Sequence, residues 1–151
     1  NDGHPRQVHC HMELDAALDF VRSRHQGVLI TLKRDGRPQL SNIAYNLGDD
    51  GVVRISITNG RAKTANIRRD DRVSLHVTRD DFYAYVVLEG EAELAPVATS
   101  PDDPTADELV AYYRGIAGEH PNWDEYRQAM VDDQRLVVRF RPSRAYGMLP
   151  S

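Results

Sequence analysis

The sequence predicts an α+β domain in which a mostly antiparallel β-barrel is flanked by peripheral helices. Short runs of β-branched and aromatic residues are separated by tight turns such as Asp35-Gly36 and Asn59-Gly60. One helical segment falls between the third and fourth of these runs, and further helical segments precede the last run. Closing five or six strands into a barrel removes the exposed edges of an open sheet.

Each element follows from the local pattern. Apolar residues at helical spacing predict the helices, and alternating β-formers predict the strands. Gly90 inside the longest strand predicts a bulge. Thr105 is expected to cap the helix that follows, with Glu108 at the capping-box position. The expected elements are a helix over 13–25 ended by Gly27, strands over 27–33, 38–47 and 52–58, a helix over 61–69, strands over 72–78 and 83–95, helices over 105–117 and 122–133, and strands over 135–141 and 145–149.

The chain is expected to form a single domain. Its 151 residues contain no repeat, no low-complexity tract and no dividing linker, so residues 13–151 are assigned to the domain and residues 1–12 to a flexible N-terminus. No apolar run approaches the roughly 20 residues of a membrane-spanning helix. A single cysteine, Cys10, allows no intrachain disulfide. These features predict a cytoplasmic protein without a membrane partner.

His9, Cys10 and His11 are three potential metal ligands in a row. Adjacent residues do not easily converge on one ion, and no partner residues stand at metal-site spacing. No metal is therefore expected, and the role of these three residues stays open.

Charge indicates the kind of ligand. The formal net charge of −4 argues against nucleic acid as the main partner. Residues 61–72 nevertheless hold five cationic residues against two aspartates, a local charge of +3 that leaves −7 for the rest. A basic site on an acidic protein suits a small anionic ligand, although a solvated helix face is the alternative.

The strongest candidate site is the stretch from Ser56 to Asn66. Here a strand ends, Gly60 turns the chain, and a helix begins near Arg61. The first N–H groups of a helix lack internal partners and bind phosphate or carboxylate, and Arg61 and Lys63 add two full charges. Asn66 lies about one turn beyond Lys63 and is expected to face the same ligand. Two interpretations stay open here: an anion site, or ordinary surface residues on a capped helix.

Two further segments are candidates. The polar strand start at Gly36-Arg-Pro-Gln-Leu-Ser-Asn42 offers amide and backbone groups for the edge of a ring, or it is a plain hairpin. Tyr83 and Tyr85 are expected on one face of the long strand, where they would line a flat cofactor or fill a core or an interface.

These motifs together resemble a known family. Asp35-Gly-Arg-Pro-Gln-Leu-Ser-Asn42 followed by Arg61-Ala-Lys-Thr64 and Asn66 is similar to the split-barrel family of pyridoxamine 5'-phosphate oxidase-like proteins. Within that family the chain resembles the actinobacterial branch that binds coenzyme F420, which the runs Ile116–His120, Trp123–Met130 and Tyr146-Gly147 also match. The resemblance covers about residues 14–150. The chain departs from it at Tyr83, where the family pattern has tryptophan.

The resemblance implies a six-stranded split β-barrel that forms a homodimer, with a cofactor at the interface. It implies that the acidic, phosphate-bearing tail of the cofactor binds Arg61, the backbone of Ala62, Lys63 and Asn66. It places five residues along the deazaflavin and its polyol, and Tyr83 and Tyr85 at the cofactor from the partner subunit. The five residues along the deazaflavin are Pro38, Gln39, Ser41, Asn42 and Ser56.

The activity implied is that of an F420-dependent reductase, an oxidoreductase that transfers a hydride from reduced deazaflavin to an unsaturated small organic substrate. The cofactor does the difficult chemistry, so no nucleophilic side chain is required. Tyr83 or Tyr85, or else water, is a candidate proton donor. Two alternatives remain: an FMN-dependent oxidase of the same fold, and a non-enzymatic protein that binds or stores F420.

Overall fold

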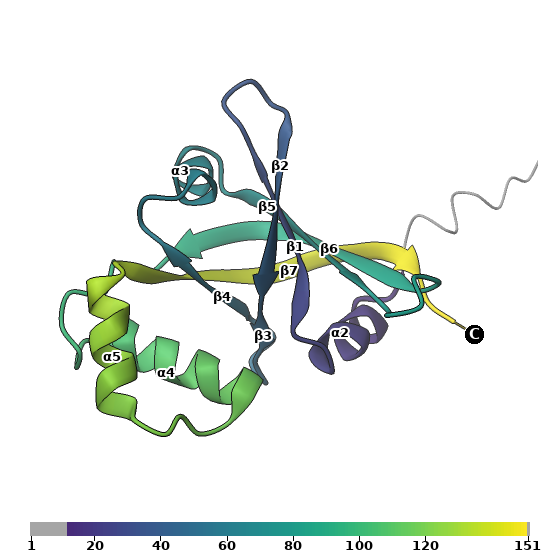
Figure 1. Cartoon of the computed structure of the whole chain (residues 1–151). Helices are drawn as coiled ribbons and strands as arrows, with labels where there is room; N and C mark the ends of the chain where they lie inside the picture. Colours follow the sequence, from purple (N-terminus) through teal and green to yellow (C-terminus); the bar gives the residue numbers. More distant parts are fainter. Residues whose placement is uncertain (1–11, 151) are drawn as a thin grey trace, which may run out of the picture.

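All the strands join in one antiparallel sheet that curls on itself, with helices at both ends (Figure 1). The structure, a computed structural model, describes residues 12–150. It confirms the α+β class, and the strand order is β2-β1-β5-β6-β7-β4-β3. The elements are α2 (Leu14–Arg22), β1 (Gln26–Leu32), β2 (Pro38–Ala44), β3 (Asn46–Leu47), β4 (Val53–Thr58), α3 (Ala62–Arg69), β5 (Arg72–Thr78), β6 (Tyr85–Leu94), α4 (Pro104–Ala117), α5 (Trp123–Asp132) and β7 (Arg135–Met148). Within these described residues, no helix has the length and apolar character needed to cross a membrane.

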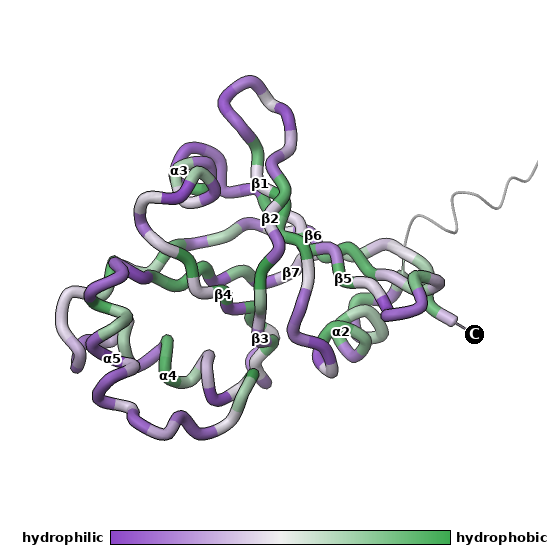
Figure 2. Tube along the Cα trace, in the orientation of Figure 1, coloured by the Kyte–Doolittle hydropathy of each residue, from purple (hydrophilic) through white to green (hydrophobic). Residues whose placement is uncertain are grey.

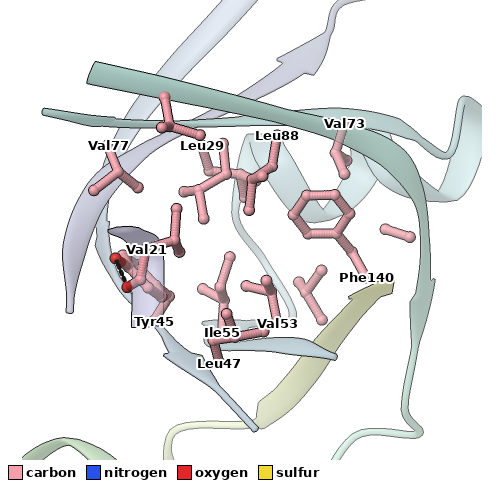
Figure 3. Packing of buried hydrophobic residues seen from close by; sticks show 14 of the residues in the cluster. Val21, Leu29, Tyr45, Leu47, Val53, Ile55, Val73, Val77, Leu88 and Phe140 are labelled. Carbon is pink, nitrogen blue, oxygen red and sulfur yellow. Dashed lines mark hydrogen bonds between the residues drawn. The ribbon is translucent and has the colours of Figure 1, made fainter. Parts of the chain in front are cut away.

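The sheet has seven strands instead of the expected six, because the return strand predicted over 38–47 breaks at Tyr45. Tyr45 is fully buried, and its N–H donates to the carbonyl of His25 at 2.8 Å. Its hydroxyl donates to the carbonyl of Val21 at 2.6 Å (Figure 3). These bonds tie Tyr45 to α2 and to the chain before β1, so β2 and β3 pair with different strands: β2 with β1, and β3 with β4.

The longest strand pair is β6 with β7, and Gly90 lies at its irregular point. The register shifts between Glu89 and Gly90, which confirms the predicted bulge. A Cβ at Gly90 would lie 2.8 Å from the carbonyl oxygen of Arg141, so only glycine allows this approach without a shift. Beyond this point β7 continues as one strand to Met148, where two pieces were expected.

The core lies inside the curl of the sheet (Figure 3). Along β4, Val53, Ile55 and Ile57 are buried, while the alternate residues face outward. Helix α2 inserts Ala17 and Val21 into the same core and ends at Arg22, shorter than predicted, because the chain enters β1 at Gln26. In Figure 2 the hydrophobic segments follow the strands, while the tip of the β1–β2 hairpin and much of α3 are hydrophilic.

Helices α4 and α5 cover part of the outer face of β4 and β7. The N-cap of α4 is Asp103, whose Oδ1 accepts the N–H of Ala106 at 2.8 Å, so the prediction that Thr105 caps this helix was wrong. Glu108 is not part of a capping box. Its carboxylate accepts hydrogen bonds from Arg139 at 2.6 and 2.7 Å and from Arg54 at 2.8 Å. These bonds fasten α4 to the sheet.

We expect Glu108→Gln to destabilise the protein in a pH-dependent way. Burial raises the pKa of Glu108, but the hydrogen bonds from Arg139 and Arg54 outweigh burial and leave the pKa below its ordinary value. A lowered carboxyl pKa stabilises the fold above the ordinary value of roughly 4.3, and this stabilisation is lost as the pH falls through the folded-state pKa. The variant should lose about 1–3 kcal/mol of unfolding free energy at pH 7.

Urea denaturation of both proteins between pH 7 and pH 3 measures this effect. The difference in unfolding free energy should shrink toward the acid end of the range. Glu91→Gln, at an exposed position of β6, is the control and should follow the wild type throughout. A difference between wild type and Glu108→Gln that stays constant over this pH range would contradict the assignment.

Candidate functional site

The barrel wall is split between β2 and β4. Strand β2 has only β1 as a strand partner within residues 12–150, and β3 covers β4 only at Val53 and Arg54. The rest of β4, Ile55–Thr58, therefore has no strand on that side, and β2 and β4 are near neighbours across the opening. Strand edges present unpaired N–H and C=O groups that can bind a partner. We call this opening the split.

The predicted ring-binding residues lie on the strands that border the split. Gln39 and Ser41 are partly buried on one face of β2, while Pro38 and Asn42 are exposed on the other. Ser56 faces outward from β4. The β2 residues and Ser56 thus lie on the two strands that border the split, but strand alternation divides the β2 residues between the two faces of β2.

The start of α3 leaves two backbone donors open. Arg61 is the N-cap, and its side chain makes no capping hydrogen bond to the helix. Thr58 O accepts the Thr64 hydroxyl at 2.7 Å and the Arg61 N–H at 3.4 Å. No acceptor within residues 12–150 contacts the N–H groups of Ala62 and Lys63, and the first turn contains no acidic residue. Open N–H groups at a helix start without a carboxylate are the elements of an anion site.

Three cationic side chains gather at this helix start. Arg61 and Lys63 come from α3 and its N-cap, and Arg135 comes from the first residue of β7. None of them forms an ion pair with a residue in the described part of the chain, 12–150. Burial, together with the charges of Arg61 and Arg135, lowers the pKa of Lys63. We call Arg61, Lys63 and Arg135 the cation cluster.

The side chain of Asn66 bonds to the β1–β2 hairpin and to Arg69 of its own helix. It is 6% exposed, and its Nδ2 donates to Thr31 Oγ1 and to Gln39 Oε1, each at 3.1 Å. Its Oδ1 accepts a hydrogen bond from Arg69 at 3.0 Å. Asn66 therefore fixes α3 against the β1–β2 hairpin and orients Gln39 at the split, while its contact with a cofactor stays a prediction.

Sequence reasoning missed Arg135. It is in register with Thr58 across the β4–β7 pair, and together with Gly60, Arg61 and Asp133 these residues line one small pocket. Its NH1 lies 3.4 Å from Ser56 Oγ and 3.5 Å from Ser56 O. No local motif marks Arg135, since its position depends on the pairing of two strands far apart in the chain.

Tyr112 of α4 was also missed. Its hydroxyl donates to the carbonyl of Ala44 at 2.9 Å and so ties α4 to the end of β2. Burial raises the pKa of Tyr112. A hydrogen bond with the Ser56 backbone and the positive charge of Arg135 lower this pKa by less. Tyr112 therefore lies close to Ser56, with its hydroxyl protonated at neutral pH. A helix pattern alone gives no sign of this contact.

The structure separates Tyr83 from Tyr85. Tyr83 precedes β6, is 78% exposed, and its N–H donates to Asp81 Oδ1 at 3.0 Å. The prediction that both tyrosines share a strand face was therefore wrong, because the strand begins only at Tyr85. Tyr85 packs against His76 of β5, with their ring centroids 5.6 Å apart.

A wide groove runs over the outer face of the sheet. It is lined by residues of β1, β2 and β5 and by Phe82 and Tyr146, and it includes the predicted site residue Asn42. Large apolar side chains are exposed along it, among them Leu40 at 62% and Phe82 at 79%. Exposed apolar patches of this kind mark interaction surfaces.

Within residues 12–150, no three His, Cys, Asp or Glu side chains lie close enough to hold an ion. His9, Cys10 and His11 lie outside the described residues.

Fold and site together define a class of protein: an antiparallel split barrel with a basic helix start beside the split. A family profile described as pyridoxamine 5'-phosphate oxidase matches residues 14–149. The chain belongs to this family.

Solved structures show the same architecture. The chain is similar to a conserved hypothetical protein from Mycobacterium tuberculosis, with 26% identity, a TM-score of 0.69, and coverage of 95% of this chain and 92% of that one. It is also similar to an F420 reductase, with 22% identity, a TM-score of 0.55, and coverage of 96% and 97%. A FAD-binding protein from Mesorhizobium loti matches with 16% identity, a TM-score of 0.65, and coverage of 90% and 92%. The last two likenesses show the fold alone.

We expect Asn66→Ala to lower the unfolding free energy by about 1–3 kcal/mol, because it leaves the buried Thr31 Oγ1 and the partly buried Gln39 Oε1 without their donor. Chemical denaturation monitored by circular dichroism measures this loss. Asn42→Ala is the control: Asn42 is exposed and its side chain makes no hydrogen bond within residues 12–150, so its stability should match the wild type. Equal stabilities of the two variants would contradict the role of Asn66.

Proposed function

We propose that this protein is an oxidoreductase that binds coenzyme F420 and transfers a hydride from the reduced deazaflavin to an unsaturated small organic substrate. The proposal rests on the family and on the split with its two strand edges. It also rests on the start of α3 beside the split, where the open N–H groups of Ala62 and Lys63 and the cation cluster form the proposed anion site. A solved structure of the same fold is an F420 reductase, which agrees with this choice of cofactor.

One observation carries the proposal: the open N–H groups of Ala62 and Lys63 lie at the same helix start as the cation cluster, next to the split. Phosphate at a helix start accepts N–H hydrogen bonds and is favoured by the helix dipole. A cofactor whose ring lies at the split and whose chain ends in acidic groups would find both binding features within one site.

The residues of this chain would bind and orient the cofactor. Lys63, Arg61 and the Ala62 N–H would hold the phosphate-bearing tail. Gln39, held by Asn66, and Ser56 would offer hydrogen bonds to the ring and its polyol. The bound deazaflavin supplies the hydride. Tyr83, Tyr85 or water would deliver the proton to the substrate.

FMN is the second candidate cofactor, and the family match to pyridoxamine 5'-phosphate oxidase favours it. Its phosphate monoester suits the same cation cluster, and the reaction would then be an FMN-dependent oxidation. A third candidate, a non-enzymatic F420-binding protein, would show binding without turnover. Fluorescence titrations with F420 and FMN separate the first two candidates. Turnover of a panel of enones and quinones with reduced F420 separates the first from the third.

Lys63→Ala should weaken binding of F420 or FMN by about 1–3 kcal/mol, the range of a charge-assisted hydrogen bond, or roughly fivefold to 150-fold in Kd. The loss arises because Lys63 contributes a full charge beside the open helix N–H groups. Fluorescence titration of the purified protein measures Kd.

Lys33→Ala is the matched control, since Lys33 is exposed in the turn after β1 and lies outside the cation cluster. Its Kd should equal that of the wild type. Equal affinities of Lys63→Ala and wild type would refute the anion site.

We propose further that a second copy of the chain covers the outer groove and forms a homodimer with the cofactor at the interface. Leu40, Phe82 and Tyr146 supply exposed apolar area. Arg79 and Asp80 supply charges of both signs. A two-fold interface needs such self-complementarity.

Leu40→Asp should convert a dimer into a monomer, because it places a charge on the apolar part of this face. Sedimentation equilibrium measures the mass. Leu40→Met keeps the apolar character and should remain dimeric. A wild-type protein that is monomeric at micromolar concentration would contradict the proposal.

A further inference from the structure

Arg135 is held in an unusual way for an arginine packed on a sheet. Its Nε is buried without an acceptor within residues 12–150, and its NH1 reaches Ser56 only at 3.4 and 3.5 Å. N–H···O bonds are ordinarily near 2.9 Å, so these two contacts are weak. A buried guanidinium donor without a partner costs free energy unless a ligand supplies the acceptor.

Arg139 on the same strand shows the contrast. It donates to Glu108 at 2.6 and 2.7 Å, and Arg54 on β4 shares the same carboxylate. The two arginines of this sheet face therefore share the carboxylate that α4 supplies. Among the described residues, no carboxylate lies within ion-pair distance of Arg135, although Asp133 lines the same pocket.

Arg135 reaches the helix start of α3 from the first residue of β7. It is paired in register with Thr58, the last residue of β4, and it shares a pocket with Arg61. Its charge lowers the pKa of Lys63, after burial and the charge of Arg61. The cation cluster carries three positive charges against the single carboxylate of Asp133. The local excess of two charges suits a ligand end with two or more negative charges, such as a phosphate monoester or a phosphodiester with added carboxylates.

We propose that Arg135 is an anion-binding residue that closes the site from the β7 side, so that the phosphate-bearing end of the ligand lies between α3 and the start of β7. The guanidinium donates to the phosphate, and its NH1 stays beside Ser56 at the split. This inference rests on the proposed function and adds a binding residue to it.

The test compares ligands that differ only in the phosphate. FMN and riboflavin are titrated against wild type and Arg135→Gln. The Kd of riboflavin divided by the Kd of FMN gives the contribution of the phosphate to binding. F420 and its chromophore without the phosphate-bearing tail are treated in the same way. Arg135→Gln should raise the Kd for the phosphorylated ligand about tenfold to 100-fold. The Kd for the ligand without phosphate should stay within about twofold, so the ratio collapses.

Two further variants complete the design. Arg135→Lys keeps the charge but loses the planar fork, and should recover part of the affinity. Arg127→Gln removes an arginine of α5 that pairs with Asp107, away from the cation cluster, and should leave the ratio unchanged.

The outcomes separate this inference from the proposed function. One outcome is that Arg135→Gln weakens the binding of both ligands equally, or leaves the Kd ratio unchanged while Lys63→Ala lowers that ratio. Arg135 is then structural, and this inference alone fails. If the wild type binds the ligands with and without phosphate equally well, or binds none of them, the anion site fails and both proposals fall.

Discussion

Antiparallel pairing of β4 with β7 is the constraint on which the site depends. It joins Thr58 to Arg135, residues that are far apart in the chain, and places them opposite each other in register. The same pairing turns Val53, Ile55 and Ile57 into the core and leaves Ser56 on the outer face. A slip of one residue would reverse these faces, exposing the core positions and burying Ser56. The core thus fixes the register, and the register positions the candidate site.

The split follows from the break at Tyr45. A continuous strand over 38–47 would pair with the same neighbouring strand along its whole length. Instead, the chain turns at the buried Tyr45, so β2 pairs with β1 and β3 pairs with β4. Opposite ends of the sheet therefore approach each other without a ladder of hydrogen bonds between them. Asn66 and Tyr112 then tie the two ends of β2 to α3 and α4. The opening is thus a consequence of packing.

Local pattern predicted much of this. The order of helices and strands, the hairpin at Asp35-Gly36 and the bulge at Gly90 depend on neighbours in sequence, and the structure agrees with them. The helix start at Arg61 was also visible, since a strand, a glycine and a helix pattern follow one another. Arg135 was not, because its place at the site depends on pairing across the sheet. Glu108 was misread for the same reason: its arginine partners come from β4 and β7.

Two groups of cationic residues, the arginines around Glu108 and the cation cluster, differ in how their charges are balanced. Around Glu108, each charge has a counter-charge, and short hydrogen bonds anchor a helix. Around Lys63, positive charges face one another, and the lowered pKa of Lys63 reflects that repulsion as well as burial. Such repulsion destabilises the folded protein while the site is empty of anions and is relieved when an anion binds. Free energy lost to folding at this point would thus reappear as affinity for the proposed phosphorylated ligand.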